Sequence, residues 1–143
     1  MLCYAGMAVD AEDIEVFNDS LERCTSHPEF LGRFYEFFLA SSPEVAEKFK
    51  NTNFARQKRA LKASLYLLIF ASEGKPEGTA HLDRMAETHG PGNMNIPPQM
   101  YDLWLESLLK AVQEFDIAFN PRVEKAWRNM LSSGIEFMRN PPK

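Results

Sequence analysis

Three polar side chains stand out because each interrupts an apolar helical pattern and each could take part in chemistry. His89 ends the apolar face of one expected helix, Tyr35 lies inside a cluster of phenylalanines, and Gln57 falls on the apolar face of the longest expected helix. An imidazole can bind a metal ion, whereas a phenol O–H and an amide N–H can donate hydrogen bonds. Taken singly, each is more typical of a structural residue whose polar atom is paired inside a core.

The elements that must position these side chains are all expected to be helices. Every clear apolar pattern recurs three and four residues apart, and no alternating segment is bounded by a hairpin turn. The chain is therefore predicted to be all-α, with helices over residues 10–24, 26–41, 43–49, 54–74, 79–89, 97–115 and 120–139. The second of these helices is so aromatic that it should be buried on more than one side.

Several helix boundaries carry recognisable capping residues. Asp10 can cap the first helix, and Ser26 with Glu29 matches a capping box that would begin the second. Pro43 follows a serine at the start of the short third helix, where its missing N–H costs no helical bond. Asn120, which also precedes a proline, can cap the last helix.

Length and composition indicate one ordinary globular domain. The 143 residues are 45% hydrophobic, 25% charged and 12% aromatic, which disfavours disorder. The net charge of −4 is spread along the chain, so phosphate-driven nucleic-acid binding is not expected. The apolar run Leu65–Ala71 is too short to span a membrane, and residues 1–9 lack the basic start of a signal peptide. Cys3 and Cys24 are interpreted as free thiols, which favours a cytoplasmic location.

Common catalytic and nucleotide-binding patterns are missing from the sequence. It has no GxGxxG, Walker, CxxC, HExxH or GxSxG arrangement. No carboxylate is placed within an apolar face by an obvious motif, so the charged groups are interpreted as a solvated surface.

The order of the remaining candidates resembles the globin family. Residues 34–49 read FYEFFLASSPEVAEKF, with Pro43 at the start of a short helix and Phe49 at its end, and His89 ends a later helix. This stretch is similar to the same part of bacterial single-domain globins and of the globin half of flavohaemoglobins. The resemblance covers about residues 10–139 and implies a single globin domain, a three-over-three helical sandwich, preceded by an extension over residues 1–9.

The resemblance also implies a cofactor and a site. His89 matches the proximal ligand of haem b, and Phe49 matches the phenylalanine that wedges against the porphyrin. Tyr35 and Gln57 would lie on the open side of the iron, where both could donate hydrogen bonds to a bound gas. Neutral imidazole suits ferrous iron, which agrees with this assignment. Three further residues would complete the haem pocket: Leu61, Met85 and Tyr101.

Two departures from the flavohaemoglobin pattern bear on the site. The connection from Phe49 to Gln57 is shorter, which leaves Arg56, Lys58 and Arg59 as alternatives for the residue that faces the ligand. Tyr101 matches a tyrosine of the proximal network, but the last helix has no acidic residue matching the glutamate of that network.

The sequence leaves more than one function open. The first hypothesis is reversible binding of oxygen or another diatomic gas, such as nitric oxide or carbon monoxide. The second is a nitric oxide dioxygenase, which would require a separate reductase as electron source. The third is a gas sensor or a globin-fold interaction protein, and a homodimer is compatible with each.

Overall fold

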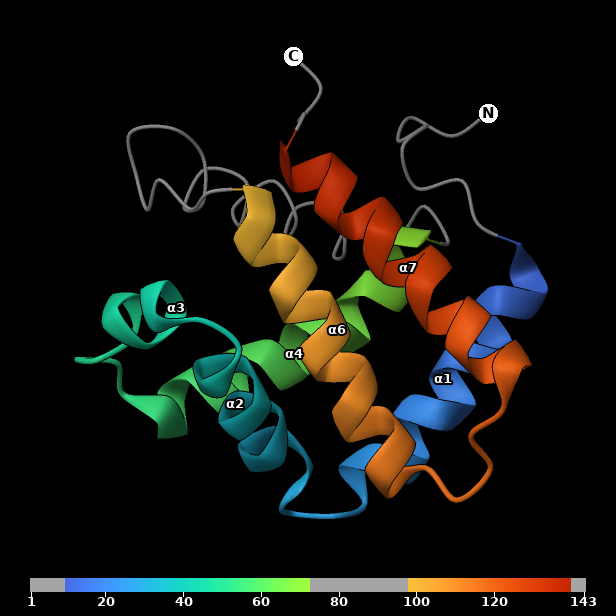
Figure 1. Ribbon diagram of the computed structural model, residues 1–143. Coiled ribbons are helices and arrows are strands. Elements are labelled where there is room, and N and C mark those ends of the chain that lie inside the picture. The colour runs from blue at the N-terminus through green and yellow to red at the C-terminus, as the bar shows by residue number, and fades with distance from the viewer. Residues whose placement is uncertain (1–9, 73–97, 140–143) are drawn as a thin grey trace.

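The computed structural model describes residues 10–72 and 98–139, and in these ranges it contains helices and no strand (Figure 1). The predicted all-α class is therefore confirmed for the described residues. The helices are α1 (Ala11–Thr25), α2 (Phe30–Ala40), α3 (Pro43–Lys48), α4 (Phe54–Ser72), α6 (Pro98–Phe115) and α7 (Pro121–Arg139). The helix expected over residues 79–89 lies outside the described residues.

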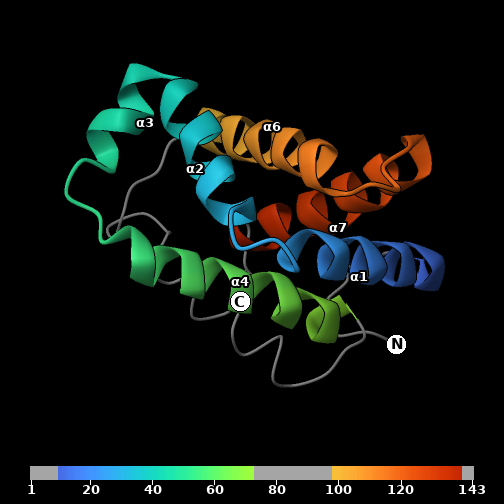
Figure 2. The ribbon, with the colours of Figure 1, turned by 90° about the horizontal axis from the view of Figure 1, so that it is seen from below.

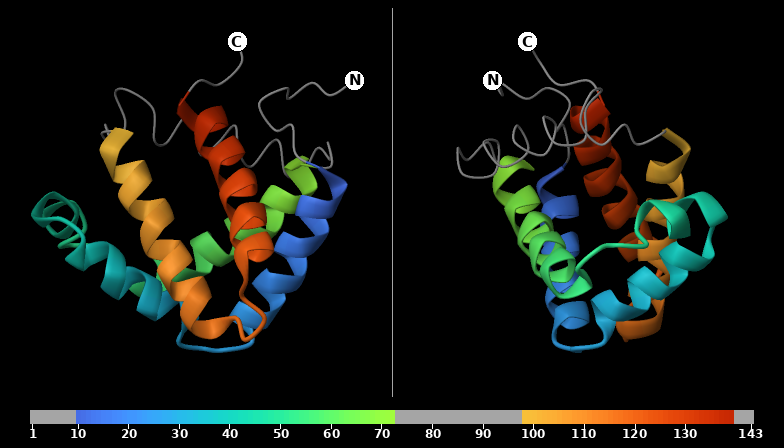
Figure 3. Two further views of the ribbon diagram at one scale, coloured as in Figure 1. Left: turned by 45° about the vertical axis from the view of Figure 1, so that its right-hand side comes forward. Right: turned by 90° about the vertical axis from the view of Figure 1, so that its left-hand side faces the viewer.

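The helices are arranged as crossing antiparallel pairs. A short connection joins the end of α6 at Phe115 to the start of α7 at Pro121, so the two helices run antiparallel. Figure 3 shows them side by side. α2 packs mainly on α6, and α1 packs mainly on α7. Figure 2 shows α1 between α7 and α4. Helix α2 contacts α1, α3, α4 and α6, so the prediction that it is buried on more than one side is confirmed.

The core forms where α1, α6 and α7 meet. Phe17 of α1 packs edge-on against Trp127 of α7, with ring centroids 4.6 Å apart, and both side chains are fully buried. The predicted inner face of the first helix is confirmed, because Phe17, Leu21 and Cys24 are buried and Ile14 is half-buried. Cys24 is a free thiol, as expected. Cys3 lies outside the described residues.

Two of the predicted helix starts are confirmed. The Ser42 hydroxyl accepts a hydrogen bond from the Glu44 N–H (3.1 Å), and Pro43 occupies the first turn of α3. At the start of α7, the Asn120 side-chain oxygen accepts from the Val123 N–H (2.8 Å). Both side chains pair backbone donors that a helix start leaves without a partner.

The predicted capping box is wrong. Ser26 is the C-cap of α1 in a helical conformation (φ −68°, ψ −14°), and its hydroxyl donates to the Arg23 carbonyl (2.7 Å). An N-cap serine needs an extended backbone, so Ser26 cannot cap the next helix. α2 begins later, at Phe30. Asp10 does precede α1 in an extended conformation, but its side chain makes no capping hydrogen bond to the described helix.

The interpretation of all charged groups as solvated surface is also wrong. Asp116 is buried and accepts hydrogen bonds from Ser20 (2.6 Å) and from Arg23, whose Nε lies 2.5 Å away. Asp13 is buried too, and it pairs with Arg122 (2.8 Å) and Asn129 (2.9 Å). A buried carboxylate is tolerated only when its charge and lone pairs are compensated in this way.

None of the helices within residues 10–72 and 98–139 combines the length and the apolar character that crossing a membrane requires.

Candidate functional site

The candidate site residues that the structure describes come from four elements. Tyr35 is buried on α2, and Leu61 is buried on α4. Gln57 is half-buried one turn before Leu61, and Phe49 is the half-buried C-cap of α3. Tyr101 is half-buried on α6. His89 and Met85 lie outside the described residues.

Phe49 is held against α2 by the geometry of the short helix before it. Its N–H donates to the Val45 carbonyl (3.1 Å), and Val45 is fully buried. The Phe49 ring then meets the Phe38 ring edge-on, with centroids 5.5 Å apart. The turn that follows is closed by a hydrogen bond from the Thr52 N–H to the Phe49 carbonyl (3.1 Å).

Aromatic rings surround Tyr35. Phe34 lies 4.7 Å from it and Phe54 lies 5.2 Å from it, centroid to centroid, and both contacts are edge-to-face. Phe34 also stacks on Phe38 (5.6 Å) and meets Trp104 of α6 edge-on (6.0 Å). The sequence analysis missed Phe54 and Trp104 as members of this site, although each falls on an apolar helical face.

The Gln57 side chain lies close enough to the Tyr35 phenol to act on its pKa. Burial raises the pKa of Tyr35 well above its usual range, and a hydrogen bond with the Gln57 side chain acts in the opposite direction. Because burial dominates, the phenol stays protonated at neutral pH and keeps its O–H as a donor. The structure therefore brings together two of the three polar residues that the sequence singled out.

The alternatives to Gln57 lie elsewhere on α4. Arg56 and Arg59 are exposed. Lys58 is half-buried, and its Nζ lies 3.4 Å from the point where a Cβ on Gly32 would stand, which places it over the outer surface of α2. Of residues 56–59, Gln57 is the one whose side chain interacts with Tyr35.

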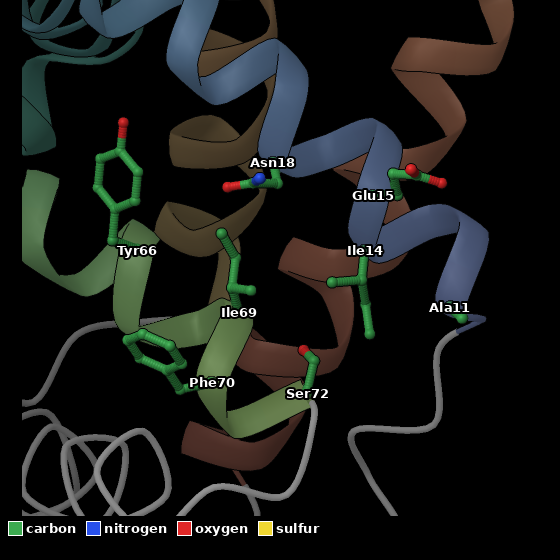
Figure 4. Close-up of a pocket in the computed structure, with 8 residues that line it drawn as sticks. All are labelled: Ala11, Ile14, Glu15, Asn18, Tyr66, Ile69, Phe70 and Ser72. Carbon is green, nitrogen blue, oxygen red and sulfur yellow. The ribbon is translucent and has the colours of Figure 1, made fainter.

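A separate groove of about 840 Å³ lies between α1 and α4 (Figure 4). Ile14, Ile69 and Phe70 contribute apolar walls, and the Tyr66 hydroxyl at one end pairs with Thr25 of α1 (2.9 Å). None of the candidate site residues is among its described lining. Over the described ranges, no group of three or more histidine, cysteine, aspartate and glutamate side chains could hold a metal ion.

The helix order, the proline-initiated α3 and the terminal Phe49 are the features on which the sequence resembles the globins, and the comparison with solved structures agrees. Among solved structures, a protein from Pseudomonas aeruginosa PAO1, described as structurally highly homologous to a human hemoglobin, is similar to this chain. The two share 32% sequence identity with a TM-score of 0.83, over 89% of this chain and 95% of that one. No protein-family model and no curated protein matches the sequence. The chain belongs to the globin family, and its predicted globin fold is confirmed.

Proposed function

We propose that this globin binds haem b through His89 and reversibly binds a diatomic gas, with oxygen as the first candidate, on the side of Tyr35 and Gln57. The observation that carries the proposal is the buried Tyr35 phenol, which contacts the rings of Phe34 and Phe54 and whose pKa is influenced by the nearby Gln57 amide. A core that needed only apolar packing would gain nothing from burying a phenol and an amide side by side. A pocket for a small polar ligand does need such donors.

The residues present fit the cofactor. A flat apolar macrocycle requires flat apolar walls, and Phe49, Phe54 and Trp104 are all half-buried, so part of each ring is not covered by the helices against which it packs. Leu61 adds a buried aliphatic surface one turn after Gln57. When bound, haem supplies a ferrous iron that has one coordination position for an imidazole and one for a gas.

Each proposed site residue then has a defined task. The Tyr35 hydroxyl and the Gln57 amide donate hydrogen bonds to a gas that carries partial negative charge. Phe49 packs against the face of the macrocycle, and Leu61 excludes water beside it. Met85 and Tyr101 are proposed as further walls. Exclusion of water matters because a dry, hydrogen-bonded ligand is retained and the iron is protected from oxidation.

The test is an absorption spectrum of the purified protein with one equivalent of haem, recorded oxidised, reduced, and reduced with carbon monoxide. The three histidines of the chain provide a matched set of variants: His89→Ala, His81→Ala and His27→Ala. His27 is exposed and packs beside Phe115, away from the candidate site residues, so His27→Ala is the control whose surroundings are known. Stoichiometric uptake with ligand-sensitive bands that only His89→Ala abolishes would support the proposal. No uptake, or bands indifferent to His89, would overturn it.

A further inference from the structure

The Tyr35 ring is in contact with two phenylalanines of different origin. Phe34 is its neighbour on α2 and therefore moves with it. Phe54 is the first residue of α4, and its ring meets Tyr35 at 5.2 Å with an interplanar angle of 63°. The Phe54 contact is thus the aromatic link that ties the orientation of Tyr35 to the position of a second helix.

The start of α4 is itself held in place. The Asn53 side chain accepts from the Arg56 N–H (3.1 Å), and the Asn53 carbonyl accepts from the Gln57 N–H (3.0 Å). Phe54 and Gln57 are three residues apart on this helix, so they lie on the same face one turn apart. The ring that contacts Tyr35 and the Gln57 amide that acts on its pKa are therefore presented together.

We propose that Phe54 is a positioning residue that fixes the orientation of the Tyr35 ring, and with it the direction of the hydroxyl, and so sets how strongly the site holds a polar diatomic ligand. The inference rests on the proposed function for its ligand, but the contact itself does not depend on haem. A phenol has only two side-chain torsions, so one packed ring is enough to restrict its direction. Without Phe54, the Tyr35 ring gains room to tilt and its hydroxyl can change direction.

Gas release from the haem-loaded full chain tests the consequence. In Phe54→Ala, oxygen dissociation should become about fivefold faster, approaching the rate of Tyr35→Phe, because a neutral hydrogen bond contributes about 1 kcal/mol. Carbon monoxide carries less negative charge, so its release should change by less than about twofold. Phe54→Leu keeps much of the bulk and should fall between the parent and Phe54→Ala.

A matched control removes a phenylalanine from α2, the helix of Tyr35, that makes no ring contact with Tyr35 among the described residues. Phe37 is half-buried beneath the Arg33 guanidinium, 4.2 Å from its ring centroid. Phe37→Ala should leave the ratio of oxygen to carbon monoxide dissociation rates at its parent value. If the substitutions acted only through lost packing, the dissociation rates of oxygen and carbon monoxide would change by the same factor, or Phe37→Ala and Phe54→Ala would have equal effects.

Tyrosine ionisation gives a second readout that does not require haem. In the parent chain, Tyr35 should resist ionisation until the helices unfold, and in Phe54→Ala it should ionise while the circular-dichroism signal of the helices is intact. The chain has four tyrosines. Subtracting the titration curve of the double variant Phe54→Ala/Tyr35→Phe from that of Phe54→Ala leaves the ionisation signal of Tyr35. If Phe54→Ala does not fold, Phe54→Leu replaces it in both assays.

The two proposals fail in different ways. Absence of haem binding in the parent chain would overturn the proposed function and leave the ionisation assay to decide the role of Phe54. Haem binding with an unchanged dissociation-rate ratio and unchanged Tyr35 ionisation in the Phe54 variant would overturn the positioning role alone.

Discussion

Replacing Asp116 with alanine should destabilise the protein more than replacing any exposed acidic residue of the described chain. The Asp116 side chain has no exposed surface. It accepts hydrogen bonds from the Ser20 hydroxyl (2.6 Å), from Arg23 through Nε (2.5 Å) and Nη2 (3.0 Å), and from the Ala118 N–H (2.8 Å). The Ser20 hydroxyl in turn accepts from the Trp127 indole N–H (2.8 Å), so the carboxylate orders a network within the core.

The magnitude follows from what the substitution leaves behind. Removing one partner of a buried ion pair costs about 3–5 kcal/mol, mainly because the other groups lose their compensation. The Arg23 side chain is 33% exposed, so water can rehydrate its charge and the lower end of that range applies. We therefore expect Asp116→Ala to lower the free energy of unfolding by about 3 kcal/mol, with a fall of roughly 10 °C in the melting temperature.

Urea unfolding at neutral pH measures this cost. Glu114→Ala is the matched control, because Glu114 is close in sequence to Asp116 and pairs with Arg33 (3.0 Å), but the Glu114 side chain is 44% exposed, whereas that of Asp116 is fully buried. The control should shift the midpoint far less, since water screens an exposed pair. A loss below about 1 kcal/mol for Asp116→Ala would refute the reasoning, because that is the range of a surface pair.

The same residue predicts a pH dependence. Hydrogen bonds from Arg23, Ser20 and Ala118 outweigh burial and hold the pKa of Asp116 below its ordinary value. The stabilisation is therefore complete above the pKa of the unfolded chain, about 4, and is lost as the pH falls through the folded value. The difference in stability between the parent and Asp116→Asn should be constant near neutral pH and should shrink below about pH 4. A difference that stayed constant into strong acid would contradict the assignment.

Two further predictions use the same structure. Burial raises the pKa of Cys24 to about 12, so in a Cys3→Ser variant a thiol reagent at mildly alkaline pH should react only as urea unfolds the chain; rapid labelling of the folded protein would contradict the burial. Asn120→Ala removes the acceptor of the Val123 N–H and should cost about 1 kcal/mol in the same unfolding assay, whereas Asn120→Asp keeps the acceptor and should cost much less; equal losses would show that the cap is not responsible.

Much of the helical framework could be predicted from the sequence because its signals are local. Pro43 after a serine, and Asn120 before a proline, mark helix starts through bonds that span only a few residues. The apolar period of α1 placed Phe17 and Leu21 in the core, as the structure confirms. A helical face needs no knowledge of its partner, since any core will bury it.

The buried carboxylates could not be found in this way, because their partners are distant in sequence. Asp116, which directly follows α6, is compensated by Ser20 and Arg23 of α1. Nothing near Asp116 distinguishes it from the exposed acidic residues of the same region. The capping box failed for a related reason: Ser26 and Glu29 have suitable side chains, but the backbone at Ser26 is still helical, and a side-chain pattern does not report that.

Which residue at the start of α4 lies beside Tyr35 could not be predicted from the sequence, because it depends on how α4 packs against α2. Spacing from Phe49 leaves Gln57 and its charged neighbours equally placed, since a short connection can enter α4 in several registers. The register is set by two aromatic contacts with α2: Phe49 meets Phe38, and Phe54 meets Tyr35. Tyr35 and Phe38 are three residues apart, so α2 receives both ends of the connection on one face. With both rings packed on α2, the first turn of α4 is fixed beside Tyr35, and Gln57 is the residue of that turn that acts on the Tyr35 pKa.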